Sequence, residues 1–215
     1  MSAALTLRIS EIFYSLQGET SRVGLPTVFV RLTGCPLRCG YCDTAYAFHG
    51  GESLTLNDIL AQVAAYQPRY VTVTGGEPLA QKAAVNLLRD LCDAGYDVSL
   101  ETSGALDICL VDPRVARIVD IKTPGSGEAS KNRWENLAHL TTHDEVKFVI
   151  TDETDYLWAR ALLAEQQLNH RCPILFSPVH GSAASDLAEW ILRDHLPVRM
   201  QLQLHKILWN DAAGR

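Results

Sequence analysis

Residues 27–44, TVFVRLTGCPLRCGYCDT, combine a short apolar stretch with a loop that holds three cysteines. In the apolar stretch Val28, Val30 and Leu32 share one face of an extended chain, and Arg31 lies on the other face. We therefore predict a strand that is buried on its aliphatic side, with the polar loop beginning where the strand ends.

Strand-like and helix-like stretches alternate along the rest of the chain. Short β-branched runs predict strands at 27–32, 70–74, 98–101, 117–121, 145–150, 173–176 and 198–204. Apolar stripes at helical spacing lie at Leu56, Ile59, Leu60 and Val63; at Ala84, Leu87, Leu88 and Leu91; at Leu157, Ala161 and Leu162; and at Leu187, Trp190 and Ile191. This alternation predicts an α/β fold of mainly parallel strands with helices packed on them. Because a complete eight-unit barrel takes about 250 residues, we expect one domain, 1–215, folded as an incomplete β/α barrel.

The composition excludes several classes of protein. Of the 215 residues, 47% are hydrophobic and 20% are charged, which is typical of a globular domain. Nineteen Lys and Arg against 25 Asp and Glu give a net charge of −6, and the basic residues are scattered, so we expect no nucleic-acid partner. No apolar run reaches the roughly 20 residues of a membrane span, and the N-terminus lacks the pattern of a secretion signal. We therefore expect no membrane partner and a cytoplasmic location.

A polar motif follows almost every predicted strand. The motifs are GCPLRCGYCDT (34–44), TGGEP (74–78), ETSG (101–104), KTPGSG (122–127), SPVHG (177–181) and QLHK (203–206). The carboxyl ends of parallel strands meet at one edge of a sheet, and the chemistry of such folds gathers there. The six motifs are therefore predicted to share one rim.

The first motif holds Cys35, Cys39 and Cys42 in a Cys-x3-Cys-x2-Cys pattern. A structural zinc site is one interpretation, but it takes four ligands and would need His49 as the fourth. The other interpretation is a four-iron four-sulfur cluster, which usually takes four cysteines and would here keep one iron open for a small molecule. The remaining cysteines, predicted to be small buried apolar residues, are Cys92, Cys109 and Cys172.

The stretch CPLRCGYC, with Tyr41 directly before Cys42, and the Gly75-Gly76-Glu77-Pro78 segment resemble the radical S-adenosylmethionine (SAM) superfamily. The resemblance implies a 4Fe–4S cluster whose open iron binds the amino and carboxylate groups of SAM. In that family an electron from the cluster cleaves SAM, and the 5'-deoxyadenosyl radical removes a hydrogen from the substrate. The cofactor carries the difficult chemistry, and the protein supplies position and electrostatics.

Within the superfamily, the chain is similar to the 7-carboxy-7-deazaguanine synthases. The similar segments are 12–19 (IFYSLQGE), Arg31, 42–44 (CDT), 101–104 (ETSG) and 203–206 (QLHK). This resemblance implies a carbon–nitrogen lyase that converts 6-carboxy-5,6,7,8-tetrahydropterin to 7-carboxy-7-deazaguanine with loss of ammonia, on the route to queuosine and other deazapurines. It also implies a homodimer and an external electron donor such as flavodoxin.

The resemblance assigns a role to each matching residue. The cluster ligands would be Cys35, Cys39 and Cys42. The pterin would bind to Leu16, Gln17, Gly18, Glu19, Arg31, Thr74, Glu101 and His205. SAM would bind to Tyr41, Gly76, Ser103, Lys122, Thr123, Pro124 and Ser177. Thr44 would bind Mg²⁺ together with substrate and water, in keeping with the preference of magnesium for oxygen ligands.

The residue types fit a pterin that carries a carboxylate. The Arg31 guanidinium can bind a carboxylate through two parallel hydrogen bonds, although a surface ion pair is an alternative role. Gln17 and Glu19 offer an amide and a carboxylate, and Gly18 lets the backbone approach a flat ring, although a plain turn also uses such residues. His205 is placed in the last predicted strand, where a satisfied core histidine is the alternative.

Other interpretations remain open at this point. Asp43 is a second candidate for the metal by charge, although an aspartate before a helix start is often a cap. A glycyl-radical activase would use the same cysteine loop on a partner protein. A zinc-binding interaction module would use the loop structurally and would leave the other polar motifs without a role.

Overall fold

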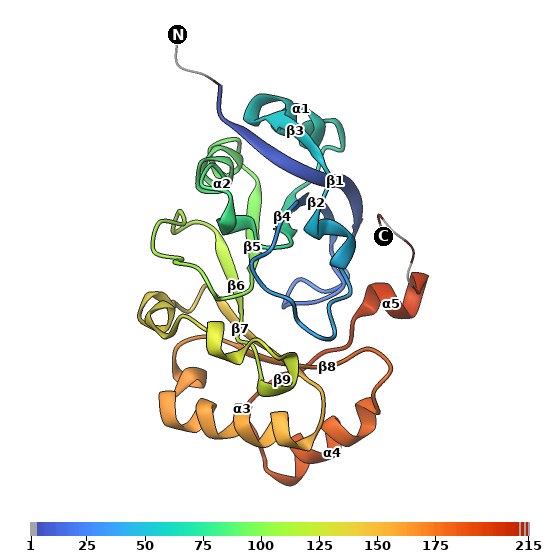
Figure 1. The fold of residues 1–215 in the computed structure, drawn as a ribbon, viewed down its shortest axis with the longest axis vertical. Helices are drawn as coiled ribbons and strands as arrows, with labels where there is room; N and C mark the ends of the chain where they lie inside the picture. Colours follow the sequence, from blue (N-terminus) through green and yellow to red (C-terminus); the bar gives the residue numbers. More distant parts are fainter. Residues whose placement is uncertain (1–3, 211, 213, 215) are drawn as a thin grey trace.

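The computed structural model describes residues 4–210, 212 and 214, and in this part of the chain the strands form one nine-stranded sheet (Figure 1). In pairing order the strands are β3 (Glu52–Thr55), β1 (Thr6–Leu16), β2 (Pro26–Leu32), β4 (Tyr70–Gly75), β5 (Asp97–Thr102), β6 (Ala116–Asp120), β7 (Glu145–Ile150), β8 (Ile174–Pro178) and β9 (Arg199–Met200). Neighbouring strands from β2 to β9 are parallel, whereas β1 pairs antiparallel with β2 and β3. The edges β3 and β9 do not pair with each other, so the predicted incomplete barrel is confirmed. The predicted extent of the domain, 1–215, stays a prediction, and its residues 1–3, 211, 213 and 215 lie outside the described ones.

Five α-helices are present in the described residues: α1 (Leu56–Ala65), α2 (Ala84–Asp93), α3 (Glu153–Gln166), α4 (Ala184–Arg193) and α5 (Leu204–Trp209). The start of α1 is fixed by a capping box, in which the Thr55 hydroxyl accepts from the Asp58 backbone N–H and the Asp58 carboxylate accepts from Thr55. α1 and α2 pack on the first half of the sheet, and α3 and α4 pack on the second half (Figure 1). The helices therefore cover the outside of the curled sheet.

The alternation in β2 decides which side of the strand faces the helices. Val28, Val30 and Leu32 are fully buried and pack with Val71 and Val73 of β4 in the first apolar core. Arg31 points to the opposite, inner side, as the sequence predicts. The inner side of the barrel is thus where the polar residues of the strands gather.

Two strands, β1 and β3, are not predicted by the sequence pattern. In β1 the buried residues Leu7 and Ile9 alternate with exposed ones, but a β-bulge between Ile9 and Glu11 breaks the alternation. β3 is only four residues long and leads directly into α1. β3 is the edge strand of the sheet, and β1 lies between it and β2.

The last predicted strand, 198–204, is wrong over most of its length. Only Arg199 and Met200 pair with β8, and Leu204 is the first residue of α5. The backbone N–H of Leu204 donates to the Gly18 carbonyl at 3.0 Å, so the chain leaves the sheet and crosses to the loop after β1. His205 therefore lies in a helix and not in a strand.

The predicted buried face of α3 is also wrong. The buried apolar residues are Tyr156, Ala159 and Leu163, whereas Leu157 is 41% exposed. The fully buried Tyr156 satisfies its hydroxyl by donating to the Trp190 carbonyl at 2.9 Å.

The cysteines outside the loop differ from one another in exposure. Cys172 is buried, in agreement with the prediction, Cys92 is partly buried against the first core, and Cys109 is exposed, so the prediction is wrong for Cys109. Cys109 and Leu110 form a turn and are both exposed, whereas Ile108 before them is fully buried, so the apolar run Ile108-Cys109-Leu110 does not by itself indicate burial.

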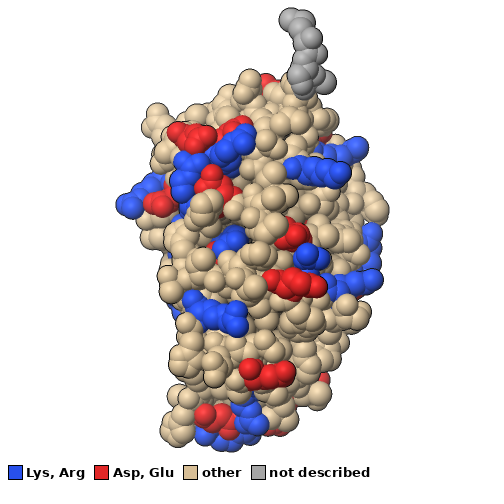
Figure 2. All heavy atoms as spheres, turned by 90° about the vertical axis from the view of Figure 1, so that its left-hand side faces the viewer, with Lys and Arg blue, Asp and Glu red and all other residues tan. Residues whose placement is uncertain are grey.

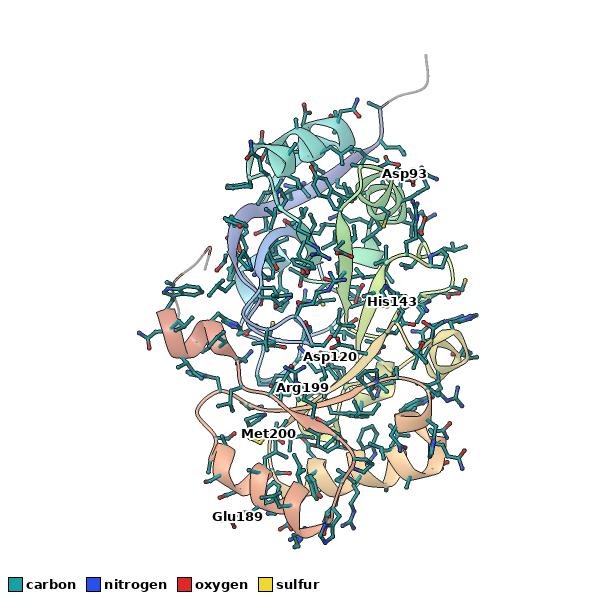
Figure 3. All side chains as sticks on the ribbon, turned by 180° about the vertical axis from the view of Figure 1, so that it is seen from behind. Asp93, Asp120, His143, Glu189, Arg199 and Met200 are labelled. Carbon is teal, nitrogen blue, oxygen red and sulfur yellow. The ribbon has the colours of Figure 1, made fainter. Side chains whose placement is uncertain are left out.

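On the outer surface, positive and negative side chains are interspersed over the face in Figure 2. No helix in the described residues has both the length and the apolar character that crossing a bilayer requires. Figure 3 shows Asp120 at the centre of the molecule, at the end of β6, whereas Asp93 and Glu189 lie on the outer helices. Asp120 therefore places a carboxylate inside the barrel, at the carboxyl ends of the parallel strands.

Candidate active site

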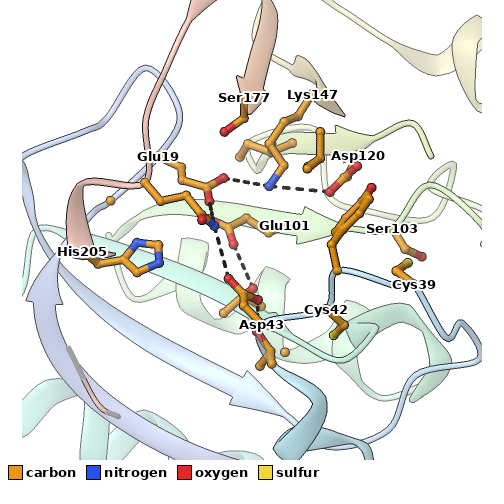
Figure 4. A pocket seen from close by; sticks show the side chains of 18 of the residues that line it. Glu19, Cys39, Cys42, Asp43, Glu101, Ser103, Asp120, Lys147, Ser177 and His205 are labelled. Carbon is orange, nitrogen blue, oxygen red and sulfur yellow. Dashed lines mark hydrogen bonds and ion pairs between the residues drawn. The ribbon is translucent and has the colours of Figure 1, made fainter. Parts of the chain in front are cut away.

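The carboxyl ends of the parallel strands surround a cavity of about 530 Å³ (Figure 4). All six polar motifs contribute residues to its lining, as the sequence predicts, and so does the loop after β1. Every predicted site residue lines the cavity except Thr123 and Pro124. The cavity is thus formed by segments that are far apart in the sequence.

The three cysteines of the loop after β2 form one part of the cavity wall. Cys35, Cys39 and Cys42 are free thiols of intermediate exposure. Burial raises the pKa of the Cys35 and Cys39 thiols, and the nearby Lys122 ammonium opposes that rise. A bound metal would take these side chains as thiolates.

The donor set of the loop fits an iron–sulfur cluster. Within the part of the chain that the structure describes, no three His, Cys, Asp or Glu side chains converge on a position for one metal ion. A cluster does not require such convergence, because its cysteines bind different irons. The geometry therefore gives no support to a zinc site at the loop, and three cysteines on one wall suit a cluster with an open iron.

Gly76 brings the TGGEP motif against the cysteine loop. A Cβ at Gly76 would overlap the backbone of Gly34, so only glycine fits here without movement. The Glu77 backbone N–H donates to the Gly34 carbonyl at 2.7 Å. The end of β4 thus holds the start of the cysteine loop in place.

Glu77 is a buried carboxylate that joins the ends of β4 and β5. Its side chain is fully buried and accepts from the Leu79 and Ser103 backbone N–H groups at 2.9 and 2.7 Å, and from the hydroxyls of Thr102 and Ser103. The sequence pattern singled out Glu77 only as part of the TGGEP motif. The Ser103 hydroxyl, a predicted SAM contact, is oriented by this carboxylate.

Across the cavity, Gln17 and Thr74 hold the side chain of Glu101. Gln17 Nε2 donates to Glu101 Oε1 at 3.2 Å, and the Thr74 hydroxyl donates to Glu101 Oε2 at 2.9 Å. Burial raises the pKa of the Glu101 carboxyl, and the Glu19 carboxylate adds to that rise. These three residues, all predicted from the resemblance, form one polar cluster.

Glu19 is held by residues that the sequence reasoning missed. Lys147 Nζ lies 2.7 Å from Glu19 Oε2, and Gln203 Nε2 donates to Glu19 Oε1 at 3.0 Å (Figure 4). Burial alone would raise the pKa of the Glu19 carboxyl, but the Lys147 ammonium and the hydrogen bonds from Lys147 and Gln203 together lower it. Gln203 also donates to Asp43 Oδ2 at 3.2 Å and so connects α5 to the cysteine loop.

Asp120, at the end of β6, lies between two lysines. Its Oδ2 is 3.0 Å from Lys122 Nζ and 3.6 Å from Lys147 Nζ. Its Oδ1 is buried and has no hydrogen-bond partner within the described residues. A buried carboxylate oxygen without a partner is costly, so this wall of the cavity suits a ligand with hydrogen-bond donors, such as SAM.

Arg31 reaches the cavity from β2. Its Nε donates to Glu11 Oε1 at 2.7 Å, and its guanidinium lies over the rings of Phe13 and Tyr46. Arg31 thus forms a mostly buried ion pair and also lines the cavity, and its binding of the substrate carboxylate stays a prediction. The pair leaves the Nη atoms for a bound carboxylate.

His205 packs on the loop after β1. A Cβ at Gly18 would overlap the His205 imidazole, so the glycine makes room for the ring. Burial lowers the pKa of His205. The ring therefore faces the cavity as a neutral donor and acceptor.

Thr44 lines the cavity next to the cysteine loop. Its hydroxyl donates to Asp43 Oδ1 at 2.7 Å. Asp43 does not cap the following 3-10 helix, since Thr44 is the residue at the cap position and makes no capping hydrogen bond. A hydroxyl and a carboxylate therefore stand together on this wall.

Thr123 and Pro124 lie outside the lining. Thr123 is fully buried, and its hydroxyl lies within hydrogen-bond distance of two acceptors, the Val149 carbonyl at 3.0 Å and Asp155 Oδ2 at 2.9 Å. Pro124 is exposed at the start of a 3-10 helix. Of the KTPGSG motif, Lys122 is the residue that lines the cavity.

Comparison with known proteins places these features in one family. Residues 29–121 match the model of the radical SAM superfamily. The whole chain is 49% identical to the 7-carboxy-7-deazaguanine synthase of Chlorobaculum tepidum, over the full length of both proteins. It is 43% identical to the synthase of the same name from Koribacter versatilis, with 95% of this chain and 97% of the relative covered.

Solved structures agree with the fold. The crystal structure of QueE from Escherichia coli is similar with a TM-score of 0.77 and 25% identity, over 93% of this chain and 95% of that chain. Streptococcus suis SuiB bound to S-adenosylmethionine has a TM-score of 0.58 at 14% identity, over 82% of this chain and 50% of SuiB, which is a likeness of fold alone.

Proposed function

The chain belongs to the 7-carboxy-7-deazaguanine synthases, a family of radical SAM enzymes, and we propose that the cavity at the end of its sheet binds SAM and a carboxylated pterin together. The reaction is the conversion of 6-carboxy-5,6,7,8-tetrahydropterin to 7-carboxy-7-deazaguanine with release of ammonia, a carbon–nitrogen lyase step of deazapurine biosynthesis. The enzyme thus acts on a small molecule.

One observation carries the proposal. A single cavity of about 530 Å³ has the three cysteines and Lys122 on one wall, and Arg31 and Glu19 on the wall formed by β1, β2 and α5. That volume is in the usual range for a small-molecule site.

The cluster and SAM, when bound, supply a 5'-deoxyadenosyl radical that removes a hydrogen from the substrate. The residues of this chain bind and orient the two molecules. Cys35, Cys39 and Cys42 are the proposed cluster ligands. The proposed SAM contacts that line the cavity are Tyr41, Gly76, Ser103, Lys122 and Ser177.

On the pterin side, the proposed contacts follow from shape and charge. Arg31 suits the substrate carboxylate, because a guanidinium binds carboxylates through two hydrogen bonds. Gln17 and Glu19 suit the amide edge of the ring, and Gly18 allows the backbone to approach it. Leu16, Thr74, Glu101 and His205 complete the proposed pterin pocket, and all four line the cavity.

Mg²⁺ dependence is part of the proposal. The Thr44 hydroxyl lies on the cavity wall beside the Asp43 carboxylate, which supports an oxygen-ligand site that substrate and water would complete. The metal would orient the carboxylated substrate.

Two further expectations, a homodimer and an external one-electron donor such as flavodoxin, rest on the family resemblance alone. A cytoplasmic location, where thiols stay reduced, rests on the sequence, which has neither a membrane-spanning run nor the pattern of a secretion signal.

The test is anaerobic reconstitution with iron and sulfide, followed by reductant, SAM, Mg²⁺ and 6-carboxytetrahydropterin. We expect 7-carboxy-7-deazaguanine by mass spectrometry, with many turnovers per SAM. An iron–sulfur protein that cleaves SAM and leaves the pterin intact would contradict the substrate assignment. A protein that retains zinc and assembles no cluster would contradict the whole proposal.

A further inference from the structure

Lys147 is a buried cation inside the cavity to which the resemblance assigns no role. On β7, Val146, Phe148 and Ile150 face the second apolar core, whereas Lys147 and Val149 face the cavity. The Lys147 side chain is only 14% exposed. A charge this deeply buried requires compensation by its neighbours.

The compensation comes from carboxylates on two sides. Lys147 Nζ lies 2.7 Å from Glu19 Oε2 and 3.6 Å from Asp120 Oδ2. Asp120 in turn pairs with Lys122, so four alternating charges run from the loop after β1 to the wall that holds the cysteines (Figure 4). Among them, Glu19 is the group on the proposed pterin side.

The contacts of Glu19 leave it room to bind a ligand. Lys147 and Gln201 donate to Oε2, and Gln203 donates to Oε1. An ionised carboxylate has about four acceptor positions, so one position on Oε1 remains. A protonated Glu19 would have fewer acceptor positions, and its O–H would be a donor. A donor cannot form a hydrogen bond with the N–H groups on the amide edge of a pterin.

We propose that Lys147 is a positioning residue that keeps Glu19 ionised and fixed in the cavity wall, so that Glu19 accepts hydrogen bonds from the N–H edge of the pterin. This inference rests on the proposed function and names a residue that acts on the substrate through another. In support, the Lys147 ammonium lies 2.7 Å from Glu19 Oε2, and its charge and hydrogen bond oppose the rise in the Glu19 pKa that burial causes. Loss of the ammonium would therefore raise the pKa of the Glu19 carboxyl and favour its protonated form.

The alternative is that Lys147 only stabilises the fold as half of a buried ion pair. Removal of one member of such a pair destabilises strongly, whereas removal of both is often tolerated. A variant that lacks both charges therefore separates the two roles. If Lys147 acts through Glu19, its removal has no further effect on pterin binding once the Glu19 charge is absent.

The test measures the dissociation constant of 6-carboxypterin, a stable probe with the same N–H edge, together with kcat and KM for the reduced pterin. The variants are Lys147→Met, Lys147→Arg, Glu19→Gln and the Glu19→Gln/Lys147→Met double variant. The surface variant Lys82→Met is the matched control, because Lys82 is exposed and lies outside the cavity lining. Cluster absorbance and SAM affinity are recorded for each protein.

We expect Lys147→Met to raise the probe dissociation constant and the pterin KM about tenfold or more, with kcat within about threefold and SAM affinity unchanged. Lys147→Arg restores binding to within about threefold, because it keeps the charge. The double variant binds no more weakly than Glu19→Gln, because Lys147 acts through Glu19. Lys82→Met behaves as the wild type.

A pterin KM within twofold of wild type for Lys147→Met overturns the inference, and so does a loss confined to kcat. If Lys147→Met does not fold, the comparison of the double variant with Glu19→Gln decides, and a further tenfold loss of probe affinity overturns the inference. A wild-type protein that binds no carboxypterin overturns the proposed function and the inference with it.

Discussion

Replacement of Glu77 by Gln tests whether the buried carboxylate holds the ends of β4 and β5 together. The Leu79 backbone N–H donates to Oε1 and the Ser103 backbone N–H donates to Oε2. A glutamine side chain has one carbonyl oxygen and one amide nitrogen. In either orientation of the amide, its NH₂ group faces one of these two backbone N–H groups. A backbone N–H is only a donor and cannot become an acceptor, so one of the two loses its hydrogen bond. The hydroxyls of Thr102 and Ser103 can rotate, so they do not add to the conflict.

The expected loss of stability follows from the hydrogen bonds that Glu77→Gln removes or weakens. One buried N–H without a partner costs about 1–3 kcal/mol, and each hydrogen bond that changes from charged to neutral loses about 1 kcal/mol. The neutral amide regains part of this, because a carboxylate is more costly to bury. We therefore expect the free energy of unfolding to fall by about 2–4 kcal/mol, which is a large fraction of the 5–15 kcal/mol typical of a domain.

The assay is urea unfolding of the cluster-free protein under reducing conditions, followed by the fluorescence of its four tryptophans. Glu135→Gln is the matched control, because Glu135 is exposed and should change stability by no more than about 0.5 kcal/mol. We also expect weaker SAM binding in Glu77→Gln, since the Ser103 hydroxyl is oriented by the carboxylate. A Glu77→Gln protein as stable as the control would refute the argument that the two backbone N–H groups need separate acceptors.

Four other predictions follow from the cavity. Arg31→Ala should raise the pterin KM at least tenfold while SAM cleavage without pterin persists; unchanged pterin affinity would contradict its role. Cys39→Ala should abolish the iron–sulfur absorbance, and Cys109→Ala, with its exposed thiol, should keep it. Gly18→Ala should weaken pterin binding, because the new Cβ must displace the α5 histidine at a cost of about 1–3 kcal/mol; wild-type KM would exclude a close approach there. Thr44→Val should raise the Mg²⁺ concentration needed for half-maximal activity, and an identical Mg²⁺ titration would remove Thr44 from the metal site.

The barrel and its rim could be predicted because their signals are local. β2, β4 and β8 are short apolar runs, and each ends in or just before a motif whose place at the strand end follows from connectivity alone. Neither argument needs knowledge of a long-range contact. The same reasoning placed Arg31 on the inner face, since two-residue alternation fixes the side of a strand.

The residues that were missed depend on contacts between distant segments. Lys147 alternates with buried residues in its strand, and this pattern also describes an ordinary half-exposed strand. Only its ion pair with Glu19, 128 positions away in the chain, identifies it as a buried charge. The prediction of the last strand was wrong at its end for a similar reason. The Leu204 N–H donates to the Gly18 carbonyl and not to the neighbouring strand.

The boundary of the superfamily match separates most of the groups proposed for the cluster and SAM from part of the pterin wall. Residues 29–121 contain the cysteine loop, Gly76, Ser103 and Asp120, whereas the proposed SAM contacts Lys122 and Ser177 lie outside that range. The loop after β1, Lys147 and α5 lie outside that range, yet they form the wall around Glu19. Arg31 and Glu101 lie within the range but on strand positions that face this wall. A change of substrate within the fold would therefore alter the loop after β1, β7 and α5 first, because these segments meet the substrate without also holding the cofactor.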